Sequence, residues 1–228
     1  STLFPYTTLF RSHALYSFAR IADDFADETW YSDSRLHHLA EWRQMLAECY
    51  EGRARHPVFV ALRDTIDRFE IPQSLLGDLI TAFEQDVQKN RYETFEEVLG
   101  YCRYSANPVG RLILLLFGYR QEELHQLSDH ICTGLQLANF WQDVAIDLRK
   151  DRIYIPREDF DRFGVCESML ASPVMADPVR NLMAFQVERT RDIFQRGRSL
   201  PDRVGRDLRL ELRLIWLDRK STRLNSSH

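Results

Sequence analysis

The sequence predicts an all-α protein, and three observations lead to that prediction. Apolar residues recur at spacings of three and four along most of the chain, which is the period of amphipathic helices. Only 9 glycines and 8 prolines occur among 228 residues, so few tight turns are available and long helices fit this scarcity. No segment keeps the alternation of a β-strand, and no repeat of fixed period is present.

Prolines help to divide this pattern into helices. Pro57 begins the third predicted helix, Pro72 precedes the fourth, Pro178 lies in the first turn of the seventh, and Pro201 precedes the eighth. These are positions where a missing N–H is tolerated. Residues 151–175 form the main irregular connection. The predicted helices cover residues 13–29, 33–51, 57–69, 73–89, 94–118, 121–149, 176–199 and 202–218.

Composition excludes several classes of protein. The net charge of −4 gives no general nucleic-acid footprint, so an anionic substrate would need local arginines or a bound metal. The cysteines lie 30 or more residues apart, which argues against a zinc site or a disulfide framework and favours reduced thiols in the cytoplasm. The longest apolar run, residues 112–117, is too short to span a bilayer. Peripheral contact with the inner face of a membrane stays open.

The two ends differ from the interior. Residues 1–12 (STLFPYTTLFRS) and 220–228 (KSTRLNSSH) have neither helical periodicity nor a targeting pattern, and both resemble translated adaptor sequence. We therefore expect two non-native tails around a domain of residues 13–219, with native sequence missing on both sides.

Two polar strips lie within the predicted helices. Each has four members at helical offsets that place them on one face. The first strip consists of Tyr16, Arg20, Asp23 and Asp27. The second strip consists of Gln136, Asn139, Asp143 and Asp147.

The spacing of these aspartates has two interpretations. Asp-xxx-Asp pairs occur three times in the chain, so the spacing alone carries little information. Like charges four residues apart repel, and Mg²⁺ held jointly with substrate phosphates would offset that repulsion. A solvated acidic face explains the same spacing, and the residues alone leave both interpretations open.

A family resemblance bears on this choice. The segment from Tyr16 to Asp27, with Asp24 included, resembles the first aspartate-rich motif of squalene and phytoene synthases, and residues 136–147 resemble the second. Arg152-Ile-Tyr154-Ile-Pro resembles the element that follows it. The resemblance implies a helical isoprenoid synthase fold with a central cavity, a farnesyl-type or presqualene diphosphate substrate, and no nucleic-acid partner. It implies Mg²⁺ ligands at Asp23, Asp27, Asp143 and Asp147, substrate binding by Arg20, Gln136, Asn139 and Arg152, and catalytic roles for Tyr16, Tyr101, Asn107 and Tyr154.

A narrower resemblance concerns the product. The stretch from Tyr101 to Gly110 is similar to the hydroxysqualene synthase branch of the hopanoid pathway, which implies water capture without NADPH. The small residues Ser105, Ala106 and Gly110 would leave room for a prenyl chain or allow close helix packing. The rings of Tyr104, Phe140 and Trp141 would either stabilise carbocations or pack in the core.

Two alternatives to this function stay open. One is a synthase that joins two prenyl diphosphates head to head, giving presqualene diphosphate, dehydrosqualene or phytoene. The other is a catalytically silent helical assembly factor of the same family.

Overall fold

Every regular element in the described part of the chain is a helix, which confirms the all-α prediction. The structure is a computed structural model that describes residues 6–172, 174–206, 208–209 and 212, with side chains described from residue 13 onward. In chain order the elements are α1 (Tyr6–Asp27), the 3₁₀ helix η1 (Thr29–Tyr31), α2 (Arg35–Tyr50), α3 (Pro57–Phe69), α4 (Gln73–Gln88), α5 (Phe95–Ser105), α6 (Asn107–Leu116), α7 (Glu122–Gln142), α8 (Val144–Arg149), α9 (Arg157–Phe163), α10 (Glu167–Leu170), α11 (Asp177–Arg196) and α12 (Leu200–Arg203).

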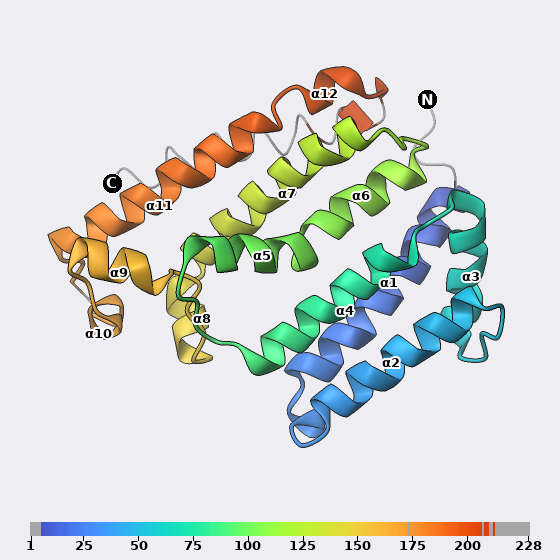
Figure 1. The fold of residues 1–228 in the computed structure, drawn as a ribbon, viewed down its shortest axis with the longest axis horizontal. Coiled ribbons are helices and arrows are strands. Elements are labelled where there is room, and N and C mark those ends of the chain that lie inside the picture. Colours follow the sequence, from blue (N-terminus) through green and yellow to red (C-terminus); the bar gives the residue numbers. More distant parts are fainter. Residues whose placement is uncertain (1–5, 173, 207, 210–211, 213–228) are drawn as a thin grey trace.

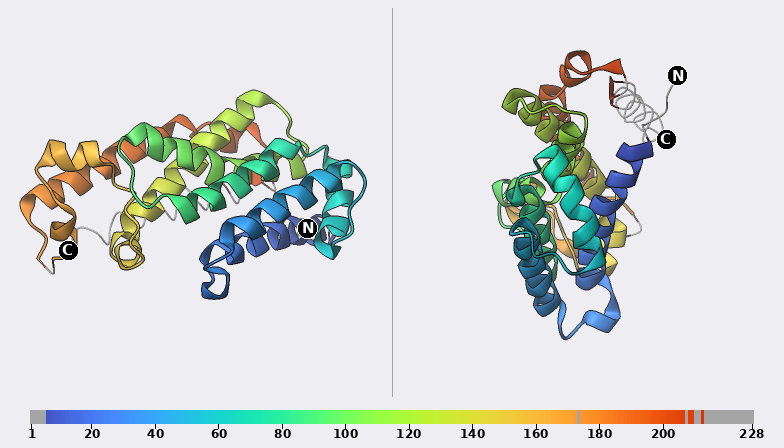
Figure 2. Two further views of the ribbon diagram at one scale, coloured as in Figure 1. Left: turned by 60° about the horizontal axis from the view of Figure 1, so that its bottom comes forward. Right: turned by 90° about the vertical axis from the view of Figure 1, so that its right-hand side faces the viewer.

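The helices form two groups that meet at α4 (Figure 1). Helix α4 packs against α1 and α2 in the first group and against α5 and α6 in the second. In the second group α11 lies along α7, and the further views in Figure 2 show the same pairing. The short helices α8, α9 and α10 lie together at the end of this group, beside the start of α5 (Figure 1).

Each group has its own apolar core. In the first core Phe18 and Leu39 are fully buried, and the indole Nε1 of Trp42 donates to the Phe18 carbonyl at 3.3 Å. The second core lies between α5, α7, α9 and α11 and buries Leu137 and Leu182 completely. Burying a side chain of this size contributes about 1.5–3 kcal/mol. Helix α4 gives residues to both cores, and this fixes the two groups against each other.

Two predicted helices are each divided in two. The predicted helix 94–118 breaks at Ala106, because Pro108 lies in the first turn of α6 and cannot continue the hydrogen-bond ladder of α5. The predicted helix 121–149 bends at Asp143, between α7 and α8. Helical hydrogen bonds continue on both sides of this bend, from Asp143 N to Asn139 O at 2.9 Å and from Asp147 N to Asp143 O at 2.8 Å.

Other boundaries also differ from the prediction. The stretch 151–175 was expected to be irregular but contains α9 and α10, and Pro156 with acidic residues in the next turn favours the start of α9. Helix α1 begins at Tyr6, inside the segment expected to be a tail. The side chains of residues 1–12 and all of 220–228 lie outside the described residues, as does most of the predicted helix 202–218. No helix in the described ranges is long and apolar enough to cross a membrane.

Gly110 allows α6 and α7 to approach closely. A Cβ at this position would overlap the Ser128 hydroxyl and lie 2.5 Å from the Cys132 sulfur. Of the two interpretations of this small residue, the structure supports close helix packing.

We therefore predict that Gly110→Ala destabilises the protein by about 1–3 kcal/mol through overpacking. Urea unfolding monitored by circular dichroism would measure this change. The matched control is Gly100→Ala in α5, where a Cβ would have no neighbour within 4 Å and where better helix propensity should add about 0.5–1 kcal/mol. Equal or higher stability of Gly110→Ala would contradict close packing and favour an open space instead.

Candidate active site

The first acidic strip lies on an accessible face of α1. Arg20 contacts two neighbouring carboxylates, Asp23 at 3.0 Å and Asp24 at 2.8 Å, and all three side chains are substantially exposed. Tyr16 is 67% exposed, so its ring is free of the first core. The Arg20 guanidinium therefore partly neutralises the two carboxylates beside it.

The second acidic strip continues across the bend between α7 and α8. Asn139 and Asp143 are exposed, whereas Gln136 and Asp147 are half-buried. Burial raises the pKa of the Asp147 carboxyl, and the neighbouring Asp143 raises it further. The like charges of this strip therefore do repel each other, as the spacing predicts.

Basic residues after α8 join this region to the first strip. Arg152 Nη2 lies 3.1 Å from Asp27 Oδ1, and Lys150 Nζ lies 3.5 Å from Asp27 Oδ2. The same Arg152 nitrogen donates to the Asp86 carbonyl at 3.3 Å. The Arg152 guanidinium thus joins the segment after α8 to the ends of α1 and α4.

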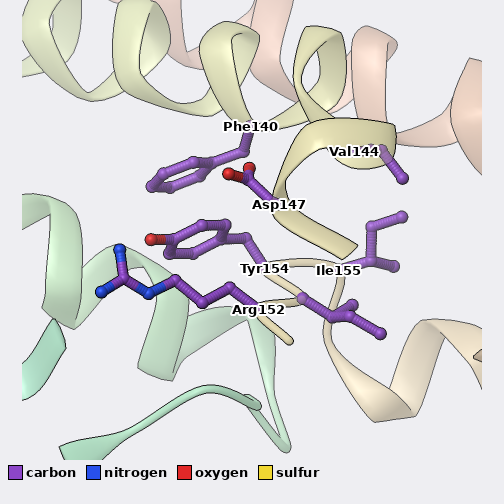
Figure 3. Close-up of a pocket in the computed structure, with 7 residues that line it drawn as sticks. Phe140, Val144, Asp147, Arg152, Tyr154 and Ile155 are labelled. Atoms are coloured by element: carbon purple, nitrogen blue, oxygen red, sulfur yellow. The ribbon is translucent and has the colours of Figure 1, made fainter. Parts of the chain in front are cut away.

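A small pocket lies beside this meeting point (Figure 3). The rings of Phe140 and Tyr154 stack with centroids 3.7 Å apart and planes 6° from parallel, and the side chains of Arg152 and Tyr154 extend in the same direction (Figure 3). The cavity has a volume of only ≈ 10 Å³, about enough for one water molecule and far below that of typical ligand sites. It is lined by Phe140, Val144, Asp147, Arg152, Ile153, Tyr154 and Ile155.

Asp86 belongs to the same region, although neither acidic motif includes it. The hydroxyl of Tyr101 donates to both oxygens of this carboxylate, at 2.8 and 3.0 Å. Burial raises the pKa of Asp86 to about 6, against the lowering effects of the Tyr101 hydrogen bond and of Arg152, and Asp27 and Asp23 raise it further. A signal was present, because Asp86 continues the buried stripe of Leu75, Leu79 and Ala82 on α4.

An aromatic cluster surrounds this carboxylate. Tyr154 stacks on Tyr92 with centroids 5.7 Å apart, and Tyr101 lies 5.7 Å from Tyr154 and 6.0 Å from Tyr92. Among the described residues, the buried hydroxyl of Tyr92 has no hydrogen-bond partner. Burial is the main cause of the raised pKa of the Tyr154 and Tyr92 hydroxyls, which keeps them protonated and able to donate.

Other predicted residues lie in packing contacts. Asn107 Oδ1 accepts a hydrogen bond from Thr133 at 2.8 Å, which ties the start of α6 to α7. Trp141 is buried and donates from Nε1 to Thr190 at 2.8 Å, which agrees with a core role. Tyr104 is half-buried, with the Arg103 guanidinium 5.8 Å from its ring. Phe140 alone of the three predicted aromatics lines the pocket.

The predicted Mg²⁺ ligands provide oxygen donors but no complete cage. Within the described residues, no three His, Cys, Asp or Glu side chains gather closely enough to hold a metal ion. Mg²⁺ usually takes one or two carboxylates and completes its shell with water and phosphate. Burial raises the pKa of Asp23, and the neighbouring Asp27 raises it further, so a cation here would relieve real repulsion. The residues fit an ion that is shared with a diphosphate.

Comparison with known proteins identifies the family. The chain matches the Squalene/phytoene synthase family over residues 3–217, and it belongs to that family, as the motifs predicted. It is 42% identical over 153 residues to the hydroxysqualene synthase of Sinorhizobium fredii, covering 66% of this chain and 51% of that protein. It is 35% identical over 214 residues to the hydroxysqualene synthase of Rhodopseudomonas palustris, covering 92% of this chain and 71% of that one.

A solved structure supports the same relationship. The crystal structure of squalene synthase HpnC from Alicyclobacillus acidocaldarius superposes with a TM-score of 0.89 at 37% identity, covering 94% of this chain and 81% of that one. The predicted isoprenoid synthase fold is therefore confirmed. The chain spans about half the length of the Sinorhizobium protein, which is 51% covered.

We predict that Asp86 makes stability depend on pH. Its pKa is raised from 3.8 to about 6, so the folded protein keeps a proton that the unfolded chain has already released between these values. Its contribution to stability is therefore present at about pH 4 and is lost as the pH rises through about 6. Asp86→Asn removes this pH-dependent loss. The free energy of unfolding of the variant minus that of the wild type should therefore rise by about 1–3 kcal/mol from pH 4 to pH 7.

Denaturant unfolding across this pH range would measure the gain. Tyr101→Phe is the companion variant, because it removes a hydrogen bond that lowers the Asp86 pKa and should move the pH transition upward. Parallel pH curves for the wild type and Asp86→Asn would contradict the prediction.

Proposed function

We propose that this chain is a magnesium-dependent enzyme that converts presqualene diphosphate and water into hydroxysqualene and diphosphate. The observation that carries the proposal is the contact of Asp27 with Lys150 and Arg152, which joins the first acidic strip to the segment that follows the second. Similarity to two proteins named hydroxysqualene synthase supports the choice of product.

The polar residues of the region suit the binding of a diphosphate. A bound Mg²⁺ would neutralise the departing diphosphate while taking oxygen ligands from Asp23, Asp27, Asp143 and Asp147. Lys150, Arg152 and Arg20 would donate charge-assisted hydrogen bonds to phosphate oxygens. Gln136 and Asn139 would add neutral hydrogen bonds from the second strip.

The reaction begins with loss of the diphosphate. The C–O bond to the diphosphate breaks, and the diphosphate leaves with the electron pair. The resulting cyclopropylcarbinyl cation rearranges to an allylic cation beside the aromatic cluster. Because Tyr92 stacks on Tyr154, Phe140 is the member of the Phe140–Tyr154 stack that would offer cation–π stabilisation to this charge.

Water capture then requires an oriented water and a proton acceptor. The water oxygen forms the new C–O bond, and its proton passes through the Tyr101 hydroxyl to the Asp86 carboxylate. A carboxylate with a pKa of about 6 suits this role near neutral pH. We assign the water to Tyr101 in place of Asn107, because the Asn107 carbonyl oxygen is already bound to Thr133. Tyr16 and Tyr154 would complete the phosphate and cation contacts.

We predict that presqualene diphosphate in H₂¹⁸O with Mg²⁺ and without NADPH gives an ¹⁸O-labelled C30 alcohol. Mass spectrometry of the product would measure the label. The label would show that the oxygen of the alcohol comes from water, and capture of the cation by water requires no hydride donor. A hydrocarbon as the main product, or a strict need for NADPH, would contradict the proposal.

Two other outcomes identify the alternatives. A C30 or C40 hydrocarbon formed from two prenyl diphosphates would favour head-to-head joining. No turnover with any prenyl diphosphate would favour a silent assembly role.

We also predict that Asp143→Ala lowers kcat/KM by about a hundredfold or more, because it removes charge stabilisation of the departing diphosphate. Since Asp143 is exposed and raises the pKa of its neighbour Asp147, its loss should leave the metal-free fold intact. Steady-state kinetics over a Mg²⁺ titration and thermal melts without metal would measure both effects. Asp161→Ala, an exposed aspartate on α9, is the control and should leave turnover unchanged. Turnover that is independent of Mg²⁺ would contradict the metal site.

A further inference from the structure

Helix α8 ends on a residue with a left-handed backbone that is not glycine. Asp151 has φ +56°. The Asp151 amide donates to the Leu148 carbonyl at 3.1 Å, and the Arg152 amide donates to the Asp147 carbonyl at 2.9 Å. This pair of hydrogen bonds is the Schellman ending of a helix, in which glycine usually takes the left-handed position because other residues are strained there.

Two residues from outside the predicted motifs hold this aspartate. Asn90 Nδ2 donates to Asp151 Oδ2 at 2.9 Å. Arg91 donates from Nη2 to Asp151 Oδ1 at 2.7 Å and from Nη1 to the Asp151 carbonyl at 2.5 Å. Both oxygens of the carboxylate and the main-chain oxygen are therefore bound. We call this set of contacts the Asp151 clasp.

The clasp is fixed to the body of the protein. Arg91 Nε also binds Glu167 of α10 at 2.8 Å. The backbone between α4 and α5 pairs with the segment after the clasp, from Ile153 N to Asn90 O at 3.0 Å and from Arg157 N to Tyr92 O at 2.9 Å. The turn at Asp151 thus packs against the connection between α4 and α5, and these two helices fix both ends of that connection.

The residues on either side of Asp151 are those that reach the first acidic strip. Lys150 precedes it and Arg152 follows it, and both contact Asp27. The main-chain oxygen of Asp147, a proposed metal ligand, accepts the Arg152 amide. A rotation of this turn would therefore move two basic side chains and change the end of α8 together.

We propose that Arg91 is a positioning residue, which with Asn90 clasps Asp151 and sets the direction in which Lys150 and Arg152 enter the diphosphate site. This inference rests on the proposed function for the identity of the ligand. Glycine would be less strained than aspartate at position 151. Aspartate, however, supplies the carboxylate that Arg91 and Asn90 bind. The Asp151 side chain is 75% exposed, and exposed ion pairs contribute little to stability, so the value of the clasp lies in orientation.

The chain contains a matched control for this arrangement. Helix α3 also ends on an acidic residue with a left-handed backbone, Glu70 with φ +53°. Arg120 binds the Glu70 carboxylate at 2.7 Å and the adjacent Phe69 carbonyl at 3.1 Å. The same chemistry occurs there without any contact to the acidic strips, so Arg120→Ala reports only the loss of a helix-end clasp.

The experiment compares Arg91→Ala, Arg91→Lys, Asp151→Gly and Arg120→Ala. Calorimetry measures the binding of inorganic pyrophosphate in the presence of Mg²⁺. Steady-state assays with presqualene diphosphate give kcat and KM, and thermal melting gives stability. Arg91→Ala should weaken pyrophosphate binding and lower kcat/KM by about tenfold or more. KM should rise more than kcat falls, because the basic side chains bind the diphosphate before it departs.

The other variants separate positioning from stability. Arg91→Lys should recover part of the binding, since one donor of the fork is restored. Asp151→Gly should lose less than Arg91→Ala, because glycine accepts the left-handed backbone and Arg91 keeps the main-chain oxygen. Arg120→Ala should match Arg91→Ala in melting temperature and match the wild type in binding and kinetics.

Two results would overturn the inference. One is unchanged pyrophosphate binding and an unchanged ratio of kcat to KM in Arg91→Ala. The other is an equal loss of pyrophosphate binding and of kcat/KM in Arg120→Ala, which would show that the clasp contributes only to general stability. A wild type that binds Mg²⁺-pyrophosphate but turns over no prenyl diphosphate would refute the proposed function, while the binding measurements would still decide the role of Arg91.

Discussion

Charge compensation around Asp27 is the interaction on which the arrangement of the site depends. Asp23, Asp27 and Asp86 come from two helices. Burial raises the pKa of Asp23 and of Asp86, and the neighbouring carboxylates raise both further. Such a group of carboxylates is costly to bring together unless cations accompany it. Lys150 and Arg152 supply those cations from a third part of the chain. The same contacts that lower the repulsion therefore also bring α1, α4 and the end of α8 together.

Apolar packing determines where this charged group lies. Helix α4 buries Leu76 and Ile80 in the first core and Ala82 in the second, and Asp86 follows on the same helix toward the second core. Tyr101 reaches Asp86 from α5, and the stacked rings of the aromatic cluster cover it. The polar centre thus sits at the junction of two apolar cores. Asp27, Asp86 and Tyr101 are placed by helices, which hold geometry better than loops do, whereas Lys150 and Arg152 come from the segment after α8.

The features that were predictable from the sequence are those set by residues close together in the chain. The helices and both acidic strips follow from the helical period, and Arg152 and Tyr154 follow from motif resemblance. The helix break at Ala106 was also predictable from the sequence, because Pro108 cannot continue the hydrogen bonds of a helix. The bend at Asp143 and the contact of Asp86 with Tyr101 were not, since both depend on what lies opposite in the fold. The position of Asp86 on a buried stripe of α4 marks it as unusual, but only tertiary packing brings Tyr101 to it.

The internal ion pairs at Asp27 also bear on how a ligand could enter. An arginine carries five donors, and in this structure Arg152 commits one nitrogen to Asp27 and to the Asp86 carbonyl. Lys150 and Asp27 are both exposed enough for water to screen their contact, so exchanging it for a phosphate oxygen costs little. The carboxylates released in that exchange would then be free to take a divalent cation, which arrives with the diphosphate. Under the proposed function, binding of the anion and binding of the metal would therefore be coupled through the same two basic side chains.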